Sequence, residues 1–134
     1  MNTLTLTADE KKVYLTLPES LREGWQILDE TQTSYETLEA LEMRIEISPL
    51  RRHPLLQEYL KRFEKGESVE KLPLPDLSQE DMGEFFFSIG ARGMTELMKS
   101  VLGNVKTDDD IRLLSSIGEM RHKLLETNAS ISYV

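Results

Sequence analysis

The sequence contains no cysteine. A disulfide framework, a zinc finger, an iron–sulfur cluster and a thiol nucleophile are therefore excluded, because each of them needs cysteine side chains. A chain of 134 residues does not depend on such cross-links, because a single domain of about 100–200 residues can bury a hydrophobic core of its own. The lack of cysteine also fits a reducing compartment.

Long hydrophobic runs are lacking as well. No run of consecutive apolar residues exceeds four, whereas a membrane-spanning helix needs about 20. The first residues, MNTLT, have neither the basic region nor the apolar region of a secretory signal peptide. We therefore expect a cytoplasmic protein that does not bind a membrane.

Positive charge is scarce, since 16 lysine and arginine residues stand against 24 aspartate and glutamate residues and the net charge is −8. This balance argues against a general nucleic-acid-binding protein, because such proteins use a basic surface to displace counterions from phosphates. The charge is also unevenly distributed. Residues 8–46 carry four basic and ten acidic side chains, whereas residues 51–65 carry five basic and two acidic ones.

Motifs of catalysis and of nucleotide binding are absent: no Gly-x-Ser-x-Gly, Walker or Gly-x-Gly-x-x-Gly pattern occurs. Glu119 and His122 have the Glu-x-x-His spacing of di-iron bundles, but such a site needs two of these pairs and the chain has one. We interpret His122 as a surface residue that pairs with Glu119 or Glu126 at helical spacing. We therefore expect no enzyme activity, no metal and no cofactor.

Helical signals dominate the chain from its start. Thr7 and Glu10 form a capping box, which predicts a helix directly after a short strand pattern over residues 3–7. A hairpin with residues 13–17 is the alternative. We favour the helix, because apolar residues recur at steps of three and four, and Pro18 must divide it into two short helices. The recurring residues are Tyr14, Leu17, Leu21, Trp25 and Leu28.

Start and stop signals divide the rest of the chain into further helices. The expected helices are residues 33–48, residues 54–66, residues 78–102 with a bend or break at Gly90–Gly93, and residues 107–127, followed by a frayed tail or a short strand over residues 128–134. The sequence thus predicts an all-α protein. We expect a small bundle of six or seven short helices, with one short strand at the N- or C-terminus.

The segment 67–77 is the one candidate connector. It contains Pro73 and Pro75, and proline favours an extended path over a helix. We therefore divide the chain into an acidic N-terminal helical part, the connector and an apolar C-terminal helical part, all within one compact domain. The two helical parts are residues 1–66 and residues 78–134.

Apolar and basic residues indicate candidate contacts with a partner. Three consecutive phenylalanines cover most of a helix circumference, so at most two can face one core and the third must meet another helix or a partner. The single tryptophan is either a core residue or a binding anchor. Basic residues around the helix 54–66 either balance the acidic helix before it or meet a partner. The candidate partner-binding residues are Trp25, Arg51, Arg52, Lys61, Arg62, Phe85, Phe86 and Phe87.

Together these features predict a non-enzymatic protein that acts through protein–protein contacts. An adaptor, a small structural subunit or an assembly chaperone of the kind that phages and mobile elements carry would fit, as a homo-oligomer or with a protein partner. The alternative is an acidic regulator that inhibits a nucleic-acid-binding protein, because an array of carboxylates can imitate phosphates. In neither case do we expect direct contact with nucleic acid.

Overall fold

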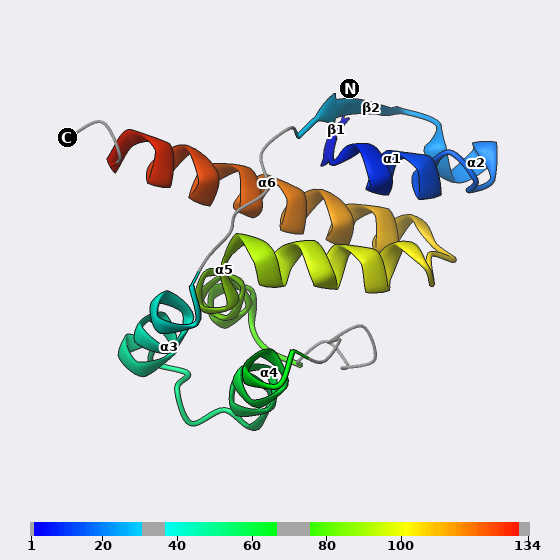
Figure 1. The fold of residues 1–134 in the computed structure, drawn as a ribbon. Helices are drawn as coiled ribbons and strands as arrows, with labels where there is room; N and C mark the ends of the chain where they lie inside the picture. The colour runs from blue at the N-terminus through cyan, green and yellow to red at the C-terminus, as the bar shows by residue number, and fades with distance from the viewer. Residues whose placement is uncertain (1, 31–36, 67–75, 132–134) are drawn as a thin grey trace.

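The computed structural model describes residues 2–30, 37–66 and 76–131. These ranges contain six helices and one sheet of two strands (Figure 1). The elements are, in chain order, β1 (Asn2–Leu6), α1 (Ala8–Tyr14), α2 (Glu19–Arg22), β2 (Trp25–Asp29), α3 (Leu38–Ile47), α4 (Pro54–Glu64), α5 (Gln79–Leu102) and α6 (Asp108–Ile131). The predicted helical bundle with a short N-terminal strand is confirmed.

The first helix begins where the capping box predicts it. The Thr7 hydroxyl accepts a hydrogen bond from the Glu10 N–H at 3.3 Å, and the Glu10 carboxylate accepts one from the Thr7 N–H at 2.9 Å. These bonds satisfy N–H groups that have no partner within the helix. The helix ends at Tyr14, and α2 begins directly after Pro18. The predicted division at this proline is therefore confirmed, and the hairpin alternative is wrong.

The expected continuation of the helical pattern through Trp25 and Leu28 is wrong. Both residues lie in β2, which pairs in parallel with β1 and places Ile27 opposite Leu4. Gly24 separates β2 from α2 with a φ of 83°, a left-handed backbone conformation that favours glycine. Helical and strand periodicities overlap in so short a segment, and pairing with a strand from the start of the chain decides between them.

The helices α5 and α6 lie side by side at the centre of the molecule, and the other elements surround them (Figure 1). The N-terminal elements contact both, since β1 packs on α6 and α1 on α5, while α3 and α4 contact α5. The predicted bend in α5 is confirmed, because Gly90 interrupts its helical geometry with a φ of 71° and a ψ of 179°. The two parts of α5 consequently run in different directions (Figure 1).

Most other helix ends follow the predicted signals. Ser48 ends α3, Pro54 opens α4, Gly66 follows α4 with a φ of 69°, and Ser78 caps α5. The expected frayed tail or strand is wrong for residues 128–131, because α6 continues through them and no glycine or proline is present there to stop it.

Three expectations fall wholly or partly outside the described residues. They are the helix start at residues 33–36, the greater part of the connector (residues 67–75) and the end of the tail (residues 132–134). Within the described residues, α3 begins only at Leu38, because Thr37 has an extended backbone and its hydroxyl caps the helix by accepting a hydrogen bond from the Ala40 N–H at 3.1 Å.

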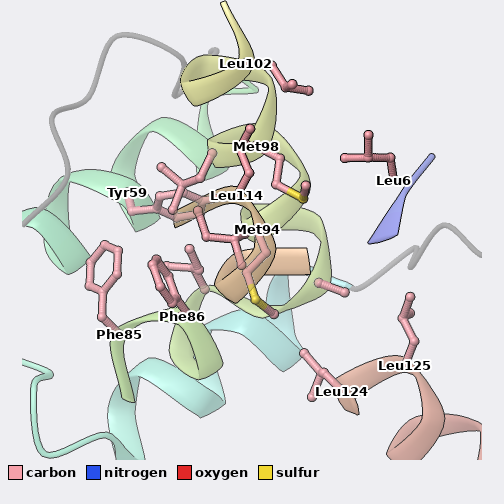
Figure 2. Close-up of a cluster of buried hydrophobic side chains, with 14 of the residues drawn as sticks. Leu6, Tyr59, Phe85, Phe86, Met94, Met98, Leu102, Leu114, Leu124 and Leu125 are labelled. Carbon is pink, nitrogen blue, oxygen red and sulfur yellow. The ribbon is translucent and has the colours of Figure 1, made fainter. Parts of the chain in front are cut away.

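One hydrophobic core joins the elements (Figure 2). Its buried residues are Leu4, Leu6, Tyr14, Leu41, Ile45, Leu56, Tyr59, Phe85, Phe86, Ile89, Ala91, Met94, Leu97, Met98, Leu102, Ile111, Leu114, Ile117, Leu124 and Leu125. The apolar stripes expected on α3 to α6 therefore face this core. Because β1 contributes Leu4 and Leu6, the core includes side chains from near both ends of the chain.

Gly118 of α6 lies directly against β1. A Cβ atom at this position would come within 2.8 Å of the Thr5 carbonyl oxygen, a main-chain atom of the strand. We therefore expect Gly118→Ala to lower the free energy of unfolding by about 1–3 kcal/mol, the usual cost of overpacking. Urea unfolding followed by circular dichroism measures this change.

Gly83→Ala is the matched control on α5. Its Cβ atom would meet only the Met120 Cε, at 3.7 Å, so the ordinary helical preference for alanine should raise the free energy of unfolding by about 0.5–1 kcal/mol. Stabilisation by both alanines would contradict the close approach of β1 to α6.

Candidate partner-binding site

The three consecutive phenylalanines of α5 have different environments. Phe85 and Phe86 are buried, and their rings meet edge to face with 6.0 Å between the centroids. Phe87 is 46% exposed. Successive side chains on a helix differ in direction by about 100°, so the two that face the core leave the third on the surface. Phe87 is the one of the three whose ring a partner can reach.

An apolar hollow lies beside Phe87, between α5 and α6. Its volume is about 200 Å³, and its lining consists of Phe87, Met94, Met120, Lys123 and Leu124. Phe87 precedes the bend at Gly90 and Met94 follows it, so the hollow takes side chains from both parts of α5. Methionine side chains are flexible and polarizable, and two of them line a hollow that can therefore adapt to the shape of a bound side chain.

The sequence reasoning missed Met94, Met120 and Leu124 as lining residues of a surface site. Their helical spacing indicated the core, and Met94 and Leu124 are indeed mostly buried. The spacing of four between Met120 and Leu124 places them on one face of α6, but only the position of the bent α5 beside that face creates the hollow.

Trp25 does not belong to this hollow. It lies at the start of β2, where it is partly buried and packs against the edge of the core. Trp25 is therefore not among the residues that line the hollow beside Phe87.

The four basic candidates lie between α3 and α4 and on α4 itself. Arg51 and Arg52 are exposed beside a shallow hollow that Glu42 and Glu46 of α3 also line. The other two are on α4 itself: Lys61 borders a second shallow hollow with Glu58 and Glu64, and Arg62 pairs with Glu58, with 3.1 Å between Nε and Oε1. Each of these cations thus has carboxylates nearby within the same chain.

A buried ion pair, which the sequence reasoning missed, connects the two ends of the chain. Both terminal nitrogens of Arg121 lie 2.9 Å from the Glu10 carboxylate oxygens, and both side chains are 1% exposed. Arg121 also donates hydrogen bonds to the Thr95 hydroxyl at 3.1 Å and to the Thr5 carbonyl oxygen at 3.3 Å. One guanidinium therefore joins β1, α1, α5 and α6. An arginine next to Met120 in an otherwise apolar stripe was the available signal.

His122 pairs with acidic residues on both sides of its ring. Its Nδ1 lies 2.9 Å from Glu30, at the end of β2, and its Nε2 lies 3.0 Å from Glu126. The expected pairing at helical spacing is therefore present with Glu126, and Glu30 is an additional partner. The hydrogen bond to Glu30 is the main cause that raises the pKa of His122 above its ordinary value, while burial opposes it.

Within residues 2–30, 37–66 and 76–131, no group of three or more histidine, cysteine, aspartate or glutamate side chains is arranged to hold a metal ion. None of the helices in these ranges has the length and apolar character needed to span a bilayer.

Comparison with known proteins gives no relative: no family model, no curated protein and no solved structure matches this chain.

The pairing of His122 makes stability depend on pH. A histidine whose pKa is raised by folding stabilises the protein fully below its ordinary pKa of about 6.5, and this contribution is lost as the pH rises through the raised value. The ring is 48% exposed, so we expect a contribution below about 1 kcal/mol.

We therefore expect the stability difference between the wild type and His122→Gln to be larger near about pH 5.5 than near about pH 8.5. Thermal unfolding at the two pH values measures this difference. An equal difference at both would show that the imidazole charge does not contribute.

Proposed function

We propose that this protein is a non-enzymatic adaptor or assembly protein that binds a protein partner through the apolar hollow at Phe87. The observation that carries the proposal is an aromatic side chain, 46% exposed, at the edge of an apolar hollow. Aromatic side chains next to well-formed apolar pockets are typical anchors of protein–protein interfaces.

The chemistry of the hollow suits a partner with an apolar side chain at its surface. A volume of about 200 Å³ with an apolar lining accepts one leucine, methionine or phenylalanine side chain of the partner. Lys123, on the lining, pairs with Glu119 at 3.4 Å, so charged side chains lie beside the apolar centre, and interfaces commonly combine an apolar centre with polar residues at the rim. The net charge of −8 favours the approach of a partner with positive charge.

Two matched substitutions test the proposal. Phe87→Asp places a carboxylate at the hollow, whereas Ile47→Asp makes the same kind of change at an exposed apolar residue of α3, which is 71% exposed. A partner is first captured with the wild type, identified by mass spectrometry and purified. We expect Phe87→Asp to weaken its binding at least about tenfold, which corresponds to about 1.4 kcal/mol, and Ile47→Asp to leave it unchanged. Equal affinity of all three proteins would overturn the proposal.

The acidic regulator is the second candidate, and one face of α3 favours it. Glu39, Glu42 and Glu46 are exposed there at steps of three and four. Two other acids of the N-terminal part are less suitable as phosphate mimics, because Glu10 and Glu30 are buried and paired with basic side chains.

A salt titration of partner binding separates the two candidates. Binding through carboxylates should weaken steeply as salt screens the charges, whereas binding through the apolar hollow should change only slightly. Replacing the three exposed glutamates of α3 by glutamine should abolish binding in the first case and leave it intact in the second.

A further inference from the structure

The outer edge of β2 has main-chain groups without partners among the described residues. Two hydrogen bonds define the ladder with β1: Asn2 N–H donates to the Gly24 carbonyl at 3.3 Å, and Glu30 N–H donates to the Leu6 carbonyl at 2.7 Å. In a parallel pair, alternate residues of a strand direct their N–H and C=O groups to the neighbouring strand. The N–H and C=O groups of Gln26, Leu28 and Glu30 therefore point to β1. The N–H and C=O groups of the alternate residues point to the outer edge of the sheet; these residues are Trp25, Ile27 and Asp29.

The other edge of the sheet is covered. On β1, the Thr3 carbonyl accepts a hydrogen bond from the Ser115 hydroxyl at 2.9 Å, and the Thr5 carbonyl accepts one from Arg121 at 3.3 Å. Both donors belong to α6. Within the part of the chain that the structure describes, the β2 edge is thus the one open edge of the sheet.

We propose that β2 pairs in antiparallel orientation with β2 of a second copy of this chain, so that two sheets of two strands join into one continuous sheet. The register follows from the outward-facing residues. Ile27 pairs with the partner's Ile27 on the twofold axis, and Trp25 pairs with the partner's Asp29. Each outward residue then exchanges N–H and C=O hydrogen bonds with the outward residue opposite it in the second copy. Every outward main-chain group of the strand therefore has a partner, because the same edge of two identical strands is complementary in antiparallel orientation.

The charges and side chains of the strand favour a second copy as the occupant. Asp29 is the only charged residue of β2, and it already pairs with Lys11 at 3.5 Å. Antiparallel pairing puts the Asp29 carboxylates of the two copies at opposite ends of the ladder, so they do not repel each other. The strand also has neither the proline nor the lysine with which many proteins protect an edge from pairing.

The small size of the sheet favours the same arrangement. A sheet of two strands is marginally stable in water, and added strands with an apolar face stabilise it. Ile27 and Trp25 are partly buried at the margin of the core, and pairing would bring the two Ile27 side chains together on that face. Leu28, on the other face, is 46% exposed and would lie beside the partner's Gln26.

Proline at an outward-facing position tests the edge without removing a bond of the existing ladder. Ile27→Pro deletes an N–H group that donates no hydrogen bond to any described residue. Ile27→Val retains this N–H group and changes the side chain only slightly. Sedimentation velocity from micromolar to millimolar concentration measures the dimer. We expect the wild type and Ile27→Val to dimerise, and Ile27→Pro to raise the dissociation constant roughly 30-fold or more.

Hydrogen exchange gives a second readout that does not depend on the variants. The amides of Gln26, Leu28 and Glu30 should be protected at all concentrations. Those of Ile27 and Asp29 should become protected only as the dimer forms. The emission of the single tryptophan, Trp25, should shift to shorter wavelength over the same range of concentration.

Three results would overturn the proposal. The first is a monomer at all concentrations, and the second is a dimer that Ile27→Pro does not weaken. If Ile27→Pro does not fold, Asp29→Pro is the variant to use in its place, because it also removes an outward N–H group. Protection of the outward amides in the dilute monomer would show that another part of the same chain covers the edge, and would also overturn the proposal. Phe87→Asp should leave the dimer intact, so this inference and the proposed function can fail separately.

Discussion

Replacing Arg121 by methionine should lower the free energy of unfolding by about 3–5 kcal/mol, because it leaves the Glu10 carboxylate buried without its counter-charge. Both side chains are 1% exposed, and two nitrogens of the guanidinium lie 2.9 Å from the carboxylate oxygens. The substitution also removes the donors to Thr95 and to the Thr5 carbonyl. A domain of this size is stable by about 5–15 kcal/mol in total, so the loss should be evident in urea unfolding.

Arg112→Met is the matched control on the same helix. Arg112 Nη1 lies 3.6 Å from Asp109 Oδ1, and the two side chains are 73% and 88% exposed. We therefore expect the free energy of unfolding to change by no more than about 0.5 kcal/mol. The double variant Glu10→Met with Arg121→Met should be more stable than Arg121→Met alone, because it contains no unpaired buried charge. If the double variant loses as much free energy of unfolding as the two single variants together, the Glu10 and Arg121 side chains are not coupled.

Phe86→Ala should lower the free energy of unfolding by about 3–5 kcal/mol, the usual cost of a large cavity in a core. Phe86 is 2% exposed and shares an edge-to-face contact with Phe85. Phe87→Ala, one position further along the same helix, should change stability by less than about 1 kcal/mol, because the ring of Phe87 is 46% exposed. Thermal and urea unfolding of both variants measure the contrast.

Partner binding should show the opposite order for these two variants. At a temperature where both are folded, Phe87→Ala should weaken the partner complex and Phe86→Ala should have a much smaller effect. Similar stability losses in the two variants would show that Phe87 is part of the core, and the site at the hollow would then be wrong.

Local signals in the sequence were sufficient for most of the helices. The Thr7–Glu10 capping box, Pro54 and Ser78 act through hydrogen bonds and backbone geometry within a few residues, so their positions could be read directly. The bend at Gly90 was predictable for the same reason, because glycine readily adopts the positive φ observed there.

Contacts between distant segments could not be predicted in this way. The sequence of β2 fits a helix and a strand about equally well, and its pairing with β1 decides the outcome. The Glu10–Arg121 pair joins residues that are 111 positions apart. The position of Arg121 in an apolar stripe indicates burial, but no local pattern identifies Glu10 as its partner. The hollow at Phe87 depends on the placement of the bent α5 against α6, which no short-range pattern contains.

The sequence by itself determined the helical class, most of the helix starts, the bend in α5 and the fact that only two of the three phenylalanines could face one core. These properties depend on interactions within one or two helical turns. The tertiary structure alone decided that Phe87 is the exposed ring, that β2 is a strand paired with β1 and that Arg121 is buried. Each of these outcomes depends on which segments, distant in sequence, pack against one another and bury their contacting surfaces. Packing of the whole chain decides this.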